Sequence, residues 1–111
     1  MTEERPVLVR KPLTDILLFF RPGSHDWSWS EEYHDLISRD AATMSAIRRR
    51  VDAEGIGFAD ESAPITLGHD KRVWDGHHRI CLAAERQESH LMVKVVPPKP
   101  GDPAPERSSD G

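Results

Sequence analysis

The amino-acid sequence predicts a single α+β domain in which a small mixed sheet packs with helices. Two observations lead to this prediction. Apolar residues recur at helical spacing in the first half of the chain and alternate, as in strands, in much of the second half. The 111 residues are enough for one hydrophobic core, and 37% hydrophobic with 31% charged residues is typical of a globular domain.

The first elements are short. Val7, Leu8 and Val9 form an apolar run typical of a strand. Pro12 then opens a helical segment over residues 13–20, which the sequence of residues 21–23 (Arg-Pro-Gly) ends.

Two longer helices follow. Ser28 and Glu31 have the spacing of a capping box, and Tyr33, Leu36 and Ile37 then share one helical face.

Asp40 is a candidate cap for the next helix, whose inner face carries Met44, Ile47 and Val51. Gly55 ends this helix.

The second half predicts a hairpin, a helix and a last strand. The strands of the hairpin are residues 64–67 and 72–75, joined by a polar turn at 68–71, and the last strand is 91–96. The helix at 77–87 is expected to bury three of its residues and to expose four others. The buried set is Ile80, Ala83 and Ala84, and the exposed set is Arg79, Glu85, Arg86 and Glu88.

The domain is expected to span residues 5–97. Five of the nine prolines lie between Pro97 and Pro105, and no apolar residue larger than alanine follows Pro97. Such a segment cannot bury enough surface to offset the entropy of ordering it, so residues 98–111 are predicted to be a disordered, Pro-rich tail.

Composition excludes several classes. A single cysteine, Cys81, allows neither an internal disulfide nor a cysteine-based zinc site, and we expect its side chain to face the core.

No apolar run is long enough to cross a membrane, and the polar N-terminus differs from a secretory leader. The sequence therefore predicts a cytoplasmic protein with no membrane partner. A formal net charge of −4 argues against a strongly basic nucleic-acid binder, although a local basic patch is compatible with it.

The segment from Asp75 to Arg79 carries the strongest functional signal. A strand ends, Gly76 turns the chain, and a helix starts with His77, His78 and Arg79. Free N–H groups at a helix start attract anions, glycine permits close approach, and arginine can bind phosphate or carboxylate oxygens. The residues predict an anion site, supported by Asp75. A structural interpretation stands beside it, in which Asp75 caps the helix or pairs with Arg79 and the histidines are half-buried.

Together these segments resemble a known family. The strand at 64–67, the sequence Val-Trp-Asp-Gly-His-His-Arg at 73–79, the pair Ala83-Ala84 and the strand at 93–97 are similar to the ParB/sulfiredoxin superfamily. The match is closest to short, stand-alone ParB-like domains, many of them encoded by bacteriophages.

The resemblance implies a ParB/sulfiredoxin-like fold that binds nucleotide or nucleic-acid phosphate. It places Gly76, His77, His78 and Arg79 around the phosphates of a nucleotide such as CTP or ATP with Mg²⁺. The chain lacks the second arginine motif and helix-turn-helix domain of partition proteins, so a sliding DNA clamp is not expected. Sulfiredoxins have a cysteine where this chain has His77, so sulfinic-acid reduction is not expected either.

Two other functions are compatible with the sequence. The fold could serve a phage-type effector that binds a host protein through Trp27 and Trp29, of which Trp29 could equally anchor its helix in the core. Some ParB-like domains are described as nucleases, and Asp75, His77 and His78 could contribute to a divalent-metal site.

A basic run, Arg48, Arg49 and Arg50, is a further candidate nucleic-acid contact, or else a solvated helix face. The sequence leaves the oligomeric state open.

Overall fold

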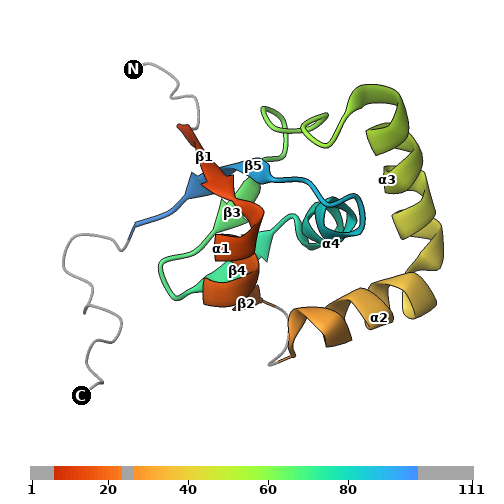
Figure 1. The fold of residues 1–111 in the computed structure, drawn as a ribbon, viewed down its shortest axis with the longest axis horizontal. Helices are drawn as coiled ribbons and strands as arrows, with labels where there is room; N and C mark the ends of the chain where they lie inside the picture. The colour runs from red at the N-terminus through yellow and green to blue at the C-terminus, as the bar shows by residue number, and fades with distance from the viewer. Residues whose placement is uncertain (1–6, 24–26, 98–111) are drawn as a thin grey trace.

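The computed structural model describes residues 7–23 and 27–97. Its four helices and five-stranded mixed sheet confirm the α+β prediction (Figure 1). The predictions for residues 1–6 and for the 98–111 tail lie outside the described residues. The strands are β1 (Leu8–Pro12), β2 (Arg21–Pro22), β3 (Ile65–Leu67), β4 (Arg72–Asp75) and β5 (His90–Val95), and the helices are α1 (Leu13–Phe19), α2 (Trp29–Arg39), α3 (Ala41–Glu54) and α4 (His77–Glu85).

The sheet has the order β1-β5-β3-β4-β2. The predicted hairpin is present as the antiparallel pair β3 and β4. The last strand, β5, lies between β1, to which it is antiparallel, and β3, to which it is parallel. The sequence did not predict β2, because two residues that include a proline give no strand pattern. It pairs in parallel with β4 and forms an edge of the sheet.

One face of the sheet is covered by α1 and α4. Leu13 and Ile16 from α1 and Ile80 and Ala83 from α4 pack there against the inward side chains of β3, β4 and β5. These inward side chains alternate along the strands, as the sequence indicated. They are Ile65, Leu67, Val73, Leu91 and Val93.

A second cluster joins α2, α3 and α4. Leu36, Met44 and Val51 pack there against Cys81 and Leu82 of α4. Figure 1 shows α2 and α3 curving around the far side of α4 from the sheet. Helix α4 is therefore the central element, with one side in each cluster.

The helix boundaries agree with most of the sequence signals. The capping box at Ser28 and Glu31 is formed in full at the start of α2. Gly55, with φ of 97°, ends α3 as expected. Helix α4 ends at Glu85, before the predicted residue 87, because Gln87 adopts a positive φ of 58° that a helix cannot continue through.

Two predicted side-chain positions on α4 are wrong. Ala84 is exposed, not buried, and Arg79 is buried, not exposed. Arg79 turns inward because a carboxylate and a backbone carbonyl meet its guanidinium below the surface. Ala84 faces a hollow between three helices, which sequence periodicity cannot distinguish from a filled core.

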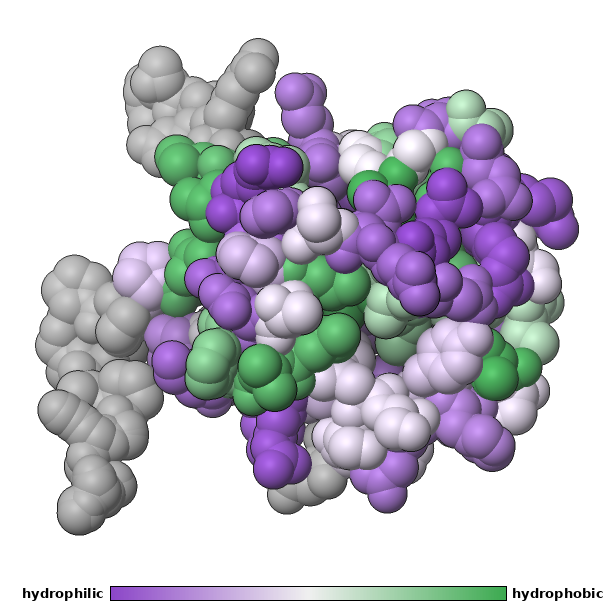
Figure 2. Space-filling view, in the orientation of Figure 1, coloured by the Kyte–Doolittle hydropathy of each residue, from purple (hydrophilic) through white to green (hydrophobic). Residues whose placement is uncertain are grey.

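No helix within residues 7–23 and 27–97 combines the length and apolar character needed to cross a membrane. In the view of Figure 2, hydrophobic residues gather over β1 and α1, whereas hydrophilic residues dominate over α3. The two sides of the molecule therefore present different chemistry to solvent.

Candidate functional site

Gly76 makes the turn between β4 and α4 possible. It is the N-cap of α4 in a left-handed conformation, with φ of 99°. A Cβ at this position would lie 2.8 Å from Cγ1 and 3.0 Å from Cα of Ile65. Only glycine therefore lets the turn pack this closely on β3. Asp75 is not the cap, and the cap residue supplies no side-chain hydrogen bond to the helix.

His77 ties the start of α4 to the residue that follows β2, the edge strand beside β4. Its Nε2 accepts a hydrogen bond of 2.9 Å from the backbone N–H of Gly23, and the ring also bonds to the backbone of Val73. Burial lowers the pKa of His77, while the negative charge of Glu32 acts in the opposite direction. Both contacts suit the neutral imidazole, which accepts with one nitrogen and donates with the other.

His78 reaches a different element. Its Nε2 lies 2.8 Å from Oδ2 of Asp40, at the junction of α2 and α3. The hydrogen bond with His78 lowers the pKa of the Asp40 carboxyl. Asp40 stands at the N-cap of α3 as predicted, but its side chain makes no capping hydrogen bond. The carboxylate binds the first turn of α4 in addition to its local neighbours.

Arg79 binds the long loop before β3. Its Nη1 donates to Oδ1 of Asp60 at 3.1 Å, and its Nη2 donates to the backbone carbonyl of Ala63. The residue is 5% exposed, and its guanidinium also lies over the ring of Phe58. Burial raises the pKa of Asp60, although the positive charge of Arg79 opposes this effect. In this structure Arg79 does not pair with Asp75.

The structure thus brings Gly76, His77, His78 and Arg79 together on one turn but sends the three side chains to three different places. A buried acid lies close by: Glu32 is 4% exposed, its Oε1 has no hydrogen-bond partner, and its charge acts on both His77 and Cys81. The surroundings of this turn are therefore more acidic than the motif alone suggests.

Two of the three arginines predicted as nucleic-acid contacts form ion pairs. Arg48 pairs with Glu85 at 2.9 Å and Arg50 with Glu54 at 2.7 Å, whereas Arg49 is exposed. The nuclease alternative has no preformed metal centre in the described part of the chain, where no three histidine, cysteine or acidic side chains converge as metal ligands would.

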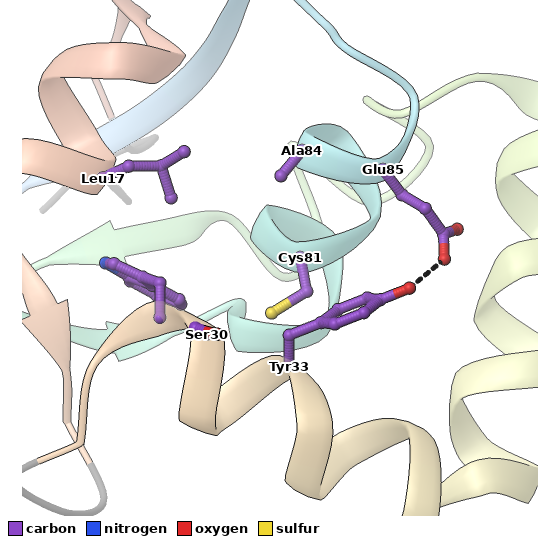
Figure 3. Close-up of a pocket in the computed structure, with 7 residues that line it drawn as sticks. Leu17, Ser30, Tyr33, Cys81, Ala84 and Glu85 are labelled. Atoms are coloured by element: carbon purple, nitrogen blue, oxygen red, sulfur yellow. Dashed lines mark hydrogen bonds between the residues drawn. The ribbon is translucent and has the colours of Figure 1, made fainter.

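A mostly apolar hollow lies one turn further along α4. A cavity of about 350 Å³ opens between α1, α2 and α4 (Figure 3). Its lining is mostly apolar and comes from all three helices: Leu17, Trp29, Ser30, Tyr33, Cys81, Ala84 and Glu85.

The polar side of the cavity is held in place by hydrogen bonds. The Tyr33 hydroxyl donates to Oε2 of Glu85 at 2.6 Å, as Figure 3 shows, and Arg48 donates to both oxygens of the same carboxylate. The bonds from Arg48 and Tyr33 lower the pKa of Glu85, and the bond to Glu85 raises the pKa of Tyr33. These bonds fix the positions of Tyr33 and Glu85 in the wall of the cavity.

Trp29 forms another wall. Its Nε1–H donates to the carbonyl of Phe20 at 2.8 Å, and its ring packs against both hydrophobic clusters. Trp29 is thus a core anchor that also lines the cavity. Trp27 is half-buried and lines a smaller hollow of about 230 Å³, which shares Leu17 and Trp29 with the cavity.

Cys81 faces the interior, as predicted. Burial raises its pKa to about 12, so the thiol stays protonated and acts as an apolar part of the wall.

Sequence reasoning named Trp29 and Cys81 singly but missed the cavity. Tyr33 was predicted on the apolar face of its helix and Glu85 on the exposed face of the last helix, and neither Leu17 nor Ser30 was singled out. Two of the lining side chains, Ser30 on α2 and Ala84 on α4, are small, and only the packing of the helices reveals that they line the same space.

Comparison with protein-family models, with curated proteins and with solved structures finds no match to this chain. The resemblance to the ParB/sulfiredoxin superfamily therefore stays a prediction.

Proposed function

We propose that this domain is a binding module that takes an apolar side chain of a partner protein into the cavity between α1, α2 and α4. The observation that carries the proposal is an open, preorganised cavity lined mainly by apolar atoms. An apolar cavity of about 150 Å³ can hold benzene, so about 350 Å³ is ample for one large side chain.

The surroundings of the cavity favour a protein over a small molecule. Leu18 is 73% exposed and Phe19 62% exposed, and both follow the cavity residue Leu17 on α1. The smaller hollow beside Trp27 continues the surface on the other side of Trp29. The apolar cavity, with the exposed Leu18 in the adjoining hollow, suits a segment that presents an apolar side chain, as amphipathic partner segments do.

This function corresponds to the predicted scaffold that binds a host protein through Trp27 and Trp29. The fold holds Trp29 rigidly, and rigid aromatic side chains are frequent anchors of protein interfaces. A phage origin and a host partner stay predictions of the resemblance.

A selection from a displayed library of random peptides tests the proposal. The full chain is the bait, and the Ala84→Trp variant, which fills the cavity from an exposed helix position, is the comparison. Ala53→Trp, at another exposed helix position, is the matched control. We expect enriched peptides with a shared large apolar residue that bind the native chain and Ala53→Trp but not Ala84→Trp. Equal binding to both variants, or no enrichment, would contradict the proposal.

A second candidate is the predicted anion site at the start of α4. The observation in its favour is that Gly76 caps the helix without a side-chain acceptor, which leaves first-turn N–H groups for an anion. In this structure the Arg79 guanidinium binds Asp60, so a phosphate would be held by these amides and by His78. Arg79 would contribute only if it left Asp60.

A titration with CTP, ATP, GTP and a short DNA duplex, each with and without Mg²⁺, tests this candidate through tryptophan fluorescence. A saturable change for one nucleotide that His78→Ala weakens would support the role implied by the resemblance, whereas Arg79→Ala would also remove a buried ion pair of the fold. No response to any of them would leave the α4 turn a structural junction.

A further inference from the structure

One face of the sheet carries no helix among the described residues. The alternation that sends Ile65, Leu67, Val73 and Val93 to the core sends their neighbours to the other face. None of these neighbours is buried, so this surface, here called the open face, is solvent-accessible. It carries Leu8, Arg10, Thr66, Arg72, Trp74, Met92 and Lys94.

The strands are basic although the chain is acidic. The five strands hold five arginines and lysines and one aspartate, a formal charge of +4 in a chain of −4. Arg10 and Lys94 form no ion pair within the described residues, whereas Arg48, Arg50 and Arg86 on the helical side pair with carboxylates. Arg10 and Lys94 are therefore open to an anionic partner.

Trp74 is a large aromatic side chain held rigidly on this open face. It is 46% exposed, yet its Nε1–H donates to Asp70 at 3.0 Å and its ring contacts the edge of His69. One side of the indole lies directly on Gly68, where a Cβ would come within 2.1 Å of Nε1. These contacts fix the indole, and its exposed part is the surface that a planar partner would contact.

The cations lie within reach of this ring. Arg72 stands two residues before Trp74 on the same face of β4. Lys94 pairs in register with Thr66, and Thr66 pairs with Asp75, so Lys94 is two strands, about 10 Å, from Asp75, the residue that follows Trp74. Four acids lie near these cations. Asp70 accepts hydrogen bonds from Trp74 and the backbone of Arg72, Asp75 is exposed, and Asp60 and Glu88 line the same hollow as Arg10.

We propose that the open face binds single-stranded nucleic acid, with an unpaired base stacked on Trp74 and backbone phosphates on Lys94 and Arg10. Aromatic rings flanked by cations bind single strands because every base has a π-face and every nucleotide a phosphate. An exposed sheet surface with aromatic side chains is a known platform for such strands. The site is distinct from the cavity and from the α4 turn.

Fluorescence anisotropy of labelled oligothymidylate and oligouridylate of about 12 nucleotides tests the proposal on the full chain, with a duplex of equal length as the competing form. Trp74→Ala should weaken binding by roughly 5- to 150-fold, and Trp74→Phe should weaken it less because it keeps a ring for stacking.

The cations have a matched control. The double variant Arg10→Gln, Lys94→Gln should lower the slope of log affinity against log salt by about 1.4, since each phosphate contact on a single strand contributes about 0.7. Arg49→Gln removes an exposed charge from α3 and should leave affinity and slope unchanged.

Three results would overturn the proposal. They are no binding of either oligonucleotide at low salt, duplex bound as tightly as single strand, and equal losses in Arg49→Gln and the sheet variants. Peptide binding at the cavity is measured separately, so either proposal can fail alone.

Discussion

The first turn of α4 and its second half use opposite kinds of residues. His77, His78 and Arg79 carry polar groups, and each is bound to a different part of the fold. Later in the helix, Cys81, Ala84 and Glu85 border an open apolar cavity. Polar side chains at a junction of several elements satisfy one another, whereas small side chains between helices leave space. The conspicuous turn therefore holds the fold together, and the inconspicuous half of the helix offers room for a ligand.

The largest effect should come from Arg79. Arg79→Ala leaves the half-buried Asp60 carboxylate and the Ala63 carbonyl without their donor, so we expect a loss of about 3 kcal/mol in the free energy of unfolding. Urea unfolding of this variant and of Arg49→Ala, an exposed arginine, measures the difference. Equal stability of the two variants would remove Arg79 from the structural role argued above.

The second-largest loss of stability should come from Gly76→Ala. Gly76→Ala combines a positive φ with contact to the Ile65 backbone, whereas Gly55→Ala has a similar φ of 97° and no atom within 4 Å of the new Cβ. We expect Gly76→Ala to cost at least about 1 kcal/mol more than Gly55→Ala, since only the first strains a packed turn. Thermal unfolding of both variants measures this difference in stability. If the two variants lose the same stability, the turn at Gly76 can move away from β3.

The lowered pKa of His77 makes the stability of the fold depend on pH. Its folded pKa is lowered from 6.5, so as pH falls through 6.5 the unfolded chain takes up a proton before the folded chain does. Stability contributed by neutral His77 is therefore present above pH 6.5 and is lost as pH falls toward the folded pKa. Unfolding at several pH values should show this loss in the native chain and a smaller one in His77→Gln. The control is His34→Gln, at an exposed histidine. If the stability of His77→Gln depends on pH as that of the native chain does, the loss does not come from His77.

The smallest effect concerns the cavity itself. Ala84→Leu adds apolar atoms to an open hollow at a helical position, so we expect a gain of about 0.5 kcal/mol. Ala53→Leu, on the exposed side of α3, should gain nothing from burial. A loss of stability in Ala84→Leu, measured by urea unfolding, would mean that the cavity is narrower than the side chain.

Much of the fold could be predicted from the sequence because periodicity and capping are local. The hairpin, the capping box at Ser28 and the glycine at the end of α3 all follow from neighbouring residues. The partners of Arg79 and His78 could not be predicted, since Asp60 and Asp40 meet them only after α2, α3 and the loop before β3 are in place. The same holds for the cavity, which depends on the distances between three helices.

The indole N–H signals of Trp27, Trp29 and Trp74 offer the most direct test of the central claim that the cavity is the partner site. Nitrogen-15 NMR spectra of the full chain, recorded while a selected peptide is added, report on all three tryptophans at once. We predict a saturable shift of the Trp29 signal, with Trp74 unchanged, because Trp29 lines the cavity and Trp74 lies on the open face. A peptide that shifts Trp74 and leaves Trp29 unmoved would contradict the account.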